Sequence, residues 1–253
     1  MITSTFCHLP RIGEAREKSI WAQGVTDWSR FMDSSKVRGI SHQKKPYYDR
    51  HLKRSMRALM DGNSSFFNSI PSGERWRLWK EYREEACLLD IETNYRNDIT
   101  VLGISDGNET WQFVKGHNMD LTKIQKMLSR FKLIVTFNGS SFDIPIIRRR
   151  MGAVIPGVPH IDLRHAAAKA GLHGGLKQIE KTLGISRPEA VEEVNGIQAL
   201  QLWEAYRGTG KRAFLDLLLE YNAEDTLNLQ PLADAVYERI SSHNMKILKK
   251  NAI

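Results

Sequence analysis

The chain has 253 residues, of which 41% are apolar and 26% charged, and its 37 Lys and Arg outnumber its 29 Asp and Glu to give a net charge of +8. This length allows one large domain, or a main domain with an appendage, and the only cysteines, Cys7 and Cys87, exclude a small disulfide-stapled protein and are expected to be reduced thiols. No apolar run approaches the ~18 residues needed to span a bilayer, so we expect a cytoplasmic protein without a membrane partner.

The positive charge is concentrated in the first third of the chain. Residues 1–85 carry 16 Lys and Arg against 10 Asp and Glu, whereas residues 86–253 carry 21 against 19. Phosphates attract Lys and Arg and release counterions when they are neutralised, so this excess indicates a polyanionic partner such as nucleic acid. A solvated basic face explains the same distribution equally well.

The first 60 residues are predicted to form a small, basic, helical region. One short helix ends before Gly24, and Thr26 is a plausible N-cap for a second. A basic helix is expected around His51 to Met60, between two loops rich in Ser, Lys and Asn. Residues 61–85 are predicted to be a linker followed by a lead-in helix.

Residues 86–242 are predicted to form an α/β domain, and residues 243–253 a C-terminal tail. The segments "CLLDIET", "ITVLGISDG" and "TWQFVKG" indicate a three-strand meander. Two further strands are expected in "KLIVTFNG" and "HIDL", and helices in "DLTKIQKMLSRF", "SFDIPIIRRRMG" and most of the remaining chain. This order is typical of a mixed sheet, with a meander and parallel strands, flanked by helices.

Two carboxylates share one face of the first predicted strand. Asp90 and Glu92 are two residues apart, so their side chains point to the same face while those of Leu89 and Ile91 point to the other. Two like charges at this spacing repel each other and need a cation. The alternative is a strand edge with its acids in water, although Asp is disfavoured within strands.

Two further acids lie within apolar sequence. Asp143 follows a strand and a polar loop in "LIVTFNGSSFDIP", where an ordinary helix-start aspartate is an equally good explanation. Asp225 lies four residues after Tyr221 and so on the same helical face, which is also typical of a solvated acid beside a core tyrosine. As a set, the four acids could converge on an oxygen-rich site for hard cations.

The segments "LDIET", "FNGSSFDIP" and "YNAEDTLNL" resemble the three exonuclease motifs of the DEDD superfamily, and the Tyr-x-x-x-Asp spacing resembles its DEDDy branch. Within that superfamily the chain is most similar to the YprB-like ribonuclease H-like group of predicted exonucleases, which the opening "LPRIGEAREKSIWAQGVTDWSRFM" also resembles. The resemblance covers roughly residues 75–235 of the chain. It implies a ribonuclease H-like fold and 3′-to-5′ exonuclease activity on DNA or RNA.

The resemblance also implies roles for individual residues. Asp90, Glu92, Asp143 and Asp225 would hold two Mg²⁺ or Mn²⁺ ions that act on the phosphodiester. Tyr221 would orient the attacking water by hydrogen bonding, because a phenol with a pKa near ~10 is a poor base at neutral pH.

Three neighbouring residues are candidates for gripping the terminal nucleotide. Thr93 would contact the 3′ end through its backbone, and Asn138 and Phe142 lie in the loop before Asp143, where loop and core roles explain them as well. The N-terminal opening resembles a phosphate-binding helix-hairpin-helix element, but Arg11 stands where that element has a glycine. A helix pair that only packs against the nuclease domain is therefore an alternative.

Three functions are consistent with these residues. A metal-dependent 3′-to-5′ exonuclease is favoured, because all four acids and the tyrosine are present. The alternatives are a nucleic-acid-binding module with a vestigial nuclease site and a ribonuclease H-like endonuclease. We also predict a division of labour, in which the basic N-terminal region holds nucleic acid and the following domain cuts it. Protein partners and the choice between DNA and RNA stay open.

Overall fold

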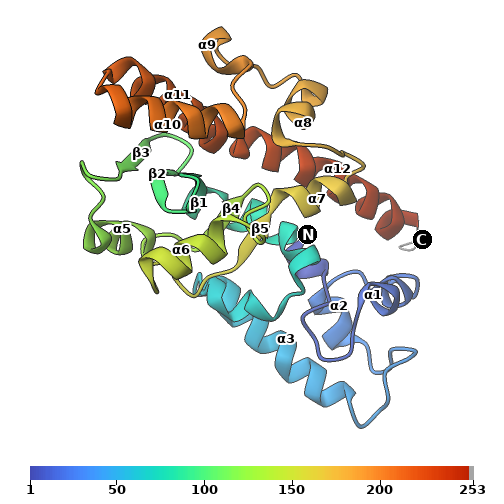
Figure 1. Cartoon of the computed structure of the whole chain (residues 1–253). Helices are drawn as coiled ribbons and strands as arrows, with labels where there is room; N and C mark the ends of the chain where they lie inside the picture. Colours follow the sequence, from blue (N-terminus) through green and yellow to red (C-terminus); the bar gives the residue numbers. More distant parts are fainter. Residues whose placement is uncertain (251–253) are drawn as a thin grey trace.

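A five-stranded mixed sheet lies at the centre of the computed structural model, which describes residues 1–250 (Figure 1). The strands are β1 (Ala86–Thr93), β2 (Ile99–Ser105), β3 (Thr110–Val114), β4 (Leu133–Thr136) and β5 (His160–Asp162). Their order in the sheet is β3-β2-β1-β4-β5. β1, β2 and β3 pair antiparallel, whereas β4 pairs parallel with both β1 and β5. The predicted meander and the two parallel strands are confirmed.

Helices cover both faces of this sheet, as predicted. The α-helices of the described residues are α1 (Glu14–Trp21), α2 (Trp28–Asp33), α3 (Lys45–Met60), α4 (Trp79–Tyr82), α5 (Leu121–Leu128), α6 (Asp143–Met151), α7 (Leu163–Lys169), α8 (Leu176–Leu183), α9 (Glu189–Glu192), α10 (Gly196–Thr209), α11 (Arg212–Leu227) and α12 (Leu229–Lys250). α5 and α6 pack on one face, and α10 and α11 on the other (Figure 1). The fold therefore has three layers, with the sheet in the middle.

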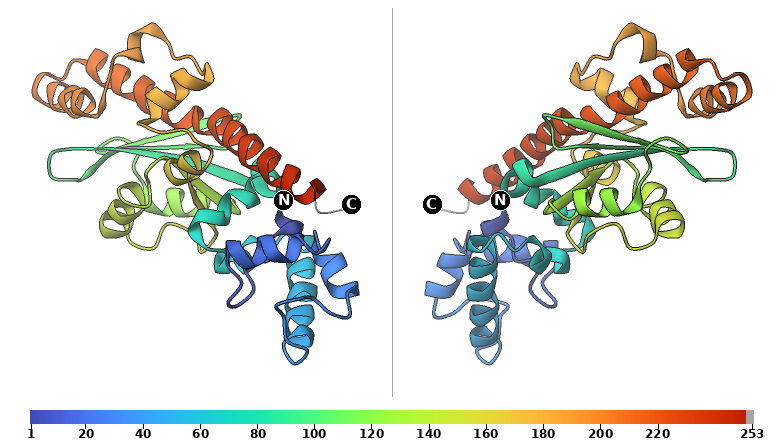
Figure 2. Two further views of the ribbon diagram at one scale, coloured as in Figure 1. Left: turned by 90° about the vertical axis from the view of Figure 1, so that its right-hand side faces the viewer. Right: turned by 90° about the vertical axis from the view of Figure 1, so that its left-hand side faces the viewer.

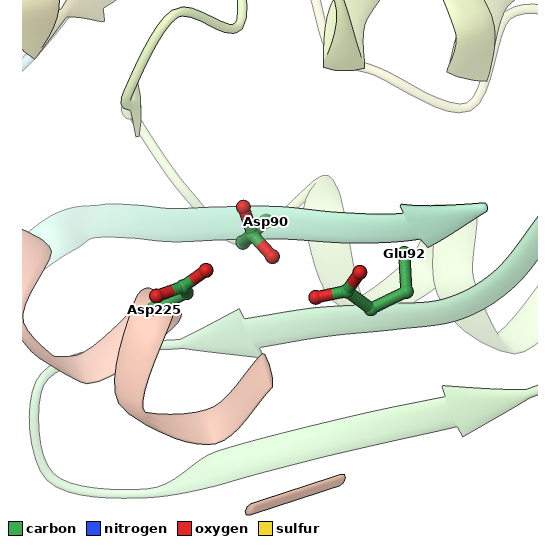
Figure 3. A group of neighbouring side chains, drawn as sticks. All are labelled: Asp90, Glu92 and Asp225. Atoms are coloured by element: carbon green, nitrogen blue, oxygen red, sulfur yellow. The ribbon is translucent and has the colours of Figure 1, made fainter. Parts of the chain in front are cut away.

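The alternation of side chains along β1 decides which groups meet α11. Leu89 and Ile91 enter the apolar cluster beneath α5 and α6. Asp90 and Glu92 point to the opposite face, toward α11 (Figure 3). The predicted assignment of these four residues to two faces is confirmed, and it places both acids between the sheet and a helix.

Gly103 lets α11 approach the sheet closely at this point. Gly103 lies on β2 and pairs directly with Asp90 on β1. A Cβ atom added at Gly103 would lie 2.5 Å from Asn222 Oδ1 and 2.5 Å from Thr226 Oγ1, both on α11. Real Cβ atoms do not come this close to other heavy atoms, so any side chain at position 103 would force the Asn222 and Thr226 side chains to move.

The N-terminal region shares an apolar core with the sheet. A single cluster of buried side chains extends from Ile2 through the N-terminal helices to Leu88 and Leu133 in the sheet and Leu248 in α12. Removing residues 1–60 would expose part of this core, so point substitutions are the appropriate test of the predicted division of labour. The boundary at residue 60, between the N-terminal region and the linker, stays a prediction.

Buried charges strengthen this connection. Glu17 of α1 is fully buried and forms an ion pair of 2.6 Å with Arg77. Arg77 also pairs with Glu74 at 2.8 Å, and Glu74 contacts the Lys169 ammonium at the end of α7. Each charge in this chain has an opposite partner, and breaking one buried pair would leave an uncompensated charge. The N-terminal region is thus fixed to the helix that follows β5.

Local details of this region differ from the predictions. The second short helix is capped by Asp27, whose Oδ1 accepts from the Arg30 N–H at 2.9 Å, and not by Thr26. The lead-in helix is mostly a 3-10 helix over Ser72–Leu78, because tertiary contacts override its local helical propensity.

Arg11 has a left-handed backbone with φ 65°, which is the conformation that glycine favours. The hairpin keeps this shape without glycine, and its phosphate binding stays a prediction.

α12 runs from beside the α10–α11 layer to the N-terminal region (Figure 2). It contains 22 residues and continues through the predicted C-terminal tail as far as Lys250, while residues 251–253 of that tail lie outside the described residues. Neither α12 nor any other helix within residues 1–250 is long and apolar enough to cross a membrane. Both cysteines are free thiols, as predicted, and both are buried.

Candidate active site

One cavity of about 320 Å³ brings together all the residues for which the sequence predicts a catalytic or substrate-binding role. It lies between the end of β1, the loop from β4 to α6, and α11. The predicted residues that line it are Asp90, Glu92, Thr93, Asn138, Phe142, Asp143, Tyr221 and Asp225. Their individual roles stay predictions, but their placement is consistent with a shared chemical function.

Three of the acids form a tight cluster. Asp90, Glu92 and Asp225 each offer a carboxylate oxygen, and these atoms all lie within 4.8 Å of one another (Figure 3). Asp143 borders the same cavity from the first residue of α6, and its Oδ1 accepts from the Ile91 N–H at 3.2 Å. That bond ties the fourth acid to the strand that carries the first two.

Burial makes this group of acids costly to ionise without a cation. Removal from water raises the pKa of Asp90 and Glu92 well above the ordinary range, and the charges of Asp225 and Asp143 raise it further. Burial also raises the pKa of Asp143 to about 7. Several desolvated carboxylates with oxygen as the only donor type fit hard divalent cations such as Mg²⁺ and Mn²⁺.

Asn222 fixes Asp90 and was missed by sequence reasoning. Its Nδ2 donates to Asp90 Oδ2 at 2.9 Å, and its own Oδ1 accepts from Gln112 Nε2 of β3 at 3.0 Å. The residue is fully buried and lies next to Tyr221 in the motif that contains Asp225. The sequence shows only that Asn222 lies three residues before Asp225. The packing of α11 against the sheet is needed to show that it faces Asp90.

Arg187 is a second residue next to the acids that the sequence did not reveal. Its Nη1 lies 2.6 Å from Asp225 Oδ1, and its Nε and Nη2 each donate to a Glu180 oxygen at 2.7 Å. Only 4% of the Arg187 side chain and 2% of the Glu180 side chain are exposed. Burial raises the pKa of Asp225, and the Arg187 guanidinium opposes that rise. A fixed positive charge therefore holds one oxygen of Asp225.

Tyr221 presents a protonated hydroxyl to the cavity. Burial raises the pKa of this phenol far above its ordinary value, and the neighbouring charges of Asp225 and Glu92 act in the same direction. The phenol therefore keeps its proton at neutral pH and acts through hydrogen bonding. The Lys177 ammonium lies 5.3 Å from the centre of the ring and is held by the backbone carbonyls of Val191 and Glu192, so the ring is supported from the α8–α9 side.

Asp162 shapes the loop that carries Asn138. Its two carboxylate oxygens accept from the N–H groups of Asn138 at 2.8 Å and Ser140 at 2.9 Å. The Asn138 side chain in turn accepts from Arg164 Nη1 at 2.8 Å. Sequence reasoning assigned no ligand role to Asp162, and these backbone contacts explain its burial. Phe142, at the end of the loop, is 39% exposed at the edge of the cavity.

A neighbouring cavity of about 530 Å³ continues the site in another direction. It shares Asp90, Asn138 and Asp225 with the first cavity and extends to Arg164 and His173. The acids therefore lie along a continuous cleft and not at the bottom of an isolated pocket.

The comparison with known families agrees with this arrangement. A family model described as the RNase H superfamily matches residues 87–237, which is more than half of the chain. The chain belongs to the RNase H superfamily. No curated protein matches it, and no solved structure matches it.

Membership in the RNase H superfamily indicates a nuclease-type hydrolase that acts on nucleic acid. The match begins at Cys87 in β1 and ends at Tyr237 in α12, so it contains every strand of the sheet apart from Ala86 and all the residues that line the acid cavity. The DEDDy branch and the YprB-like group are finer assignments and stay predictions.

We expect the metal-free RNase H domain to lose stability as the pH rises through about 7. Because the pKa of folded Asp143 is raised from 3.8 to about 7, the folded chain binds more protons than the unfolded chain between these values. The free energy of unfolding should therefore fall by about 2 kcal/mol between about pH 5.5 and pH 8, as Asp143 loses its proton in the folded chain. Asp143→Asn should abolish this part of the loss.

Calorimetry in EDTA checks this expectation. The melting temperature of Asp143→Asn minus that of the wild type should grow with pH. Parallel pH profiles for the two proteins would show that Asp143 ionises normally in the folded state.

Proposed function

We propose that this protein is a metal-dependent 3′-to-5′ exonuclease that hydrolyses DNA or RNA with two divalent ions, Mg²⁺ or Mn²⁺. One observation carries this proposal: the half-buried Asp90 and three buried acids, from β1, α6 and α11, converge on one cavity together with a protonated tyrosine. Membership in the RNase H superfamily supports nuclease chemistry. The order of the motifs along the sequence supports the exonuclease assignment.

The four acids have complementary parts in this proposal. Asp90, Glu92 and Asp225 would hold the ions, with Asp143 adding a ligand from the edge of the cavity. When bound, the ions would lower the pKa of the attacking water and offset the charge that develops on the leaving oxygen. Without them, the cluster of carboxylates repels phosphate.

The surrounding residues orient the reacting groups. The Tyr221 hydroxyl donates a hydrogen bond that orients the water, which its raised pKa favours at neutral pH. Thr93 and Phe142 line the side of the cavity where the terminal nucleotide would be held. Asn222 and Arg187 each restrain an oxygen of one acid, so that the carboxylates are oriented before the substrate arrives.

We expect the purified protein, supplied with Mg²⁺ or Mn²⁺, to shorten a 5′-labelled single strand from its 3′ end in single-nucleotide steps. A circular strand of the same sequence should stay intact, because an exonuclease needs an end. EDTA should stop the reaction. Matched DNA and RNA strands will show which sugar the cavity accepts.

The same experiment separates the competing functions. Cleavage of the circular strand would overturn the exonuclease assignment in favour of an endonuclease. Binding of the linear strand without cleavage, with either metal, would favour a vestigial site. Asp90→Asn prepared in parallel controls for a contaminating nuclease.

A further inference from the structure

A second groove, of about 660 Å³, lies beside the candidate active site and has no part in the chemistry proposed above. Its walls are the β1–β2 turn, the β3–α5 turn and one face of α10. The groove combines aromatic with basic side chains, chiefly Tyr95, Arg96, Lys115, Trp203, Tyr206 and Arg207. We call it the Tyr95 groove.

The β1–β2 turn presents an exposed aromatic ring from a rigid backbone. Tyr95 is 67% exposed, although large apolar side chains are normally covered. Asn94 Oδ1 accepts from the N–H groups of Arg96 and Asp98, both at 2.9 Å, which closes the turn. Arg150 on α6 donates to the carbonyl oxygens of the turn. The ring is therefore held in solvent by an ordered turn and not by a loose loop.

Two cations of the groove are free to bind an anion. Lys115 is paired with Asp98 at 3.1 Å. Neither Arg96 nor Arg207 has a carboxylate partner within ion-pair distance among the described residues. Glu204 is also part of the lining, so the groove is mixed in charge but has an excess of positive groups. Two free guanidinium groups beside an exposed ring suit a phosphate chain that carries flat bases.

The groove continues the candidate active site. Thr93 lines the acid cavity, and the next residue on the chain, Asn94, lines the groove. Helix α10 also borders both, with Gly196 and Leu200 at the acid cavity and Trp203 and Arg207 at the groove. This continuity distinguishes the groove from an isolated basic patch on the surface.

We propose that the Tyr95 groove binds a single-stranded segment of the nucleic-acid substrate, with a base stacked on Tyr95 and phosphates beside Arg96 and Arg207. The inference rests on the proposed function for the identity of the ligand. Binding itself does not require hydrolysis, so the two proposals can fail separately.

The test measures binding to the full-length Asp90→Asn protein in Mg²⁺, where hydrolysis of the strand cannot interfere. Fluorescence anisotropy with a labelled single strand of about 12 nucleotides gives Kd. Tyr95→Ala should weaken binding roughly 5- to 150-fold, because a base can no longer stack on an aromatic ring. Tyr95→Phe keeps the ring and should bind like the parent. Circular dichroism checks that each variant is folded.

Salt dependence tests the two arginines. Arg96→Ala with Arg207→Ala should weaken binding and lower the slope of log Kd against log salt by about 1.4, which is ~0.7 for each phosphate that is no longer neutralised. Arg239→Ala is the matched control, because Arg239 is exposed on α12, away from the groove. It should leave both affinity and slope unchanged.

Each outcome decides one of the proposals. Unchanged binding in Tyr95→Ala, or an equal loss in Arg239→Ala, would overturn the groove inference even if the wild type shortens strands. Tyr95-dependent binding by a protein that hydrolyses nothing would support the groove and overturn the exonuclease. Binding that responds to the arginines but not to Tyr95 would show that phosphates bind there without stacking, and the inference as stated would be wrong.

Discussion

Asp90→Asn should reduce nuclease activity by about 10³-fold or more and, at the same time, make the metal-free protein more stable. Asp90 faces three other acids, and burial together with their charges raises its pKa well above the ordinary range. The neutral amide has the same shape and can still accept from Asn222 Nδ2. It removes a repulsive charge, which should add about 1–3 kcal/mol to the free energy of unfolding in EDTA.

Thermal scans with and without Mn²⁺ measure both effects. The wild type should gain stability from Mn²⁺, whereas Asp90→Asn should start higher in EDTA and gain less. Asp216→Asn is a suitable control, because Asp216 is on the same helix as Asp225 but is exposed and paired with Arg212. Full activity in Asp90→Asn, or a lower melting temperature in EDTA, would contradict the arrangement of the acids described here.

Arg187→Met should destabilise the protein by about 3–5 kcal/mol, because it leaves the buried Glu180 carboxylate without its partner. It should also slow hydrolysis, since Asp225 loses the group that restrains its Oδ1. Combining Arg187→Met with Glu180→Gln should restore much of the stability, because the orphaned charge is then removed. The double variant should still hydrolyse nucleic acid slowly, because Arg187 also positions Asp225.

Urea unfolding of the two single variants and the double variant forms a cycle that measures this coupling. Arg212→Met serves as the control, because the Arg212–Asp216 pair is exposed and its loss should change the stability little. Strictly additive losses would show that Glu180 and Arg187 do not depend on each other. Normal activity in the stabilised double variant would limit Arg187 to a structural role.

The sequence predicted those features of the site that depend on local periodicity. Asp90 and Glu92 lie on one face of β1 because side chains alternate along any strand, so their spacing alone was sufficient. Likewise, Tyr221 and Asp225 line one cavity, as two residues four apart on a helix can. β1, β2 and β4 were found because each is a short, mostly apolar run, and β3 because a turn joins it to β2.

The features that escaped prediction depend on which elements pack together. Arg187 lies in the loop between α8 and α9, where no spacing relates it to Asp225. Nothing in the helical periodicity distinguishes Asn222 from other residues of α11. It reaches Asp90 only because α11 packs closely against the sheet. The 3-10 geometry of Ser72–Leu78 also depends on tertiary contacts, since the inward-facing Arg77 pairs with buried acids from two elements.

Gly103 has a consequence for how related sequences should be interpreted. It carries no functional group, yet it leaves room for the Asn222 side chain that donates to Asp90. A relative with a larger residue at this position would keep every acid and the tyrosine in its sequence, while the asparagine side chain that holds the first aspartate was displaced. Inspection of motifs would class such a protein as an intact enzyme. For a chain that folds like this one, the residue opposite the first aspartate is thus informative about retained activity, as the acids themselves are.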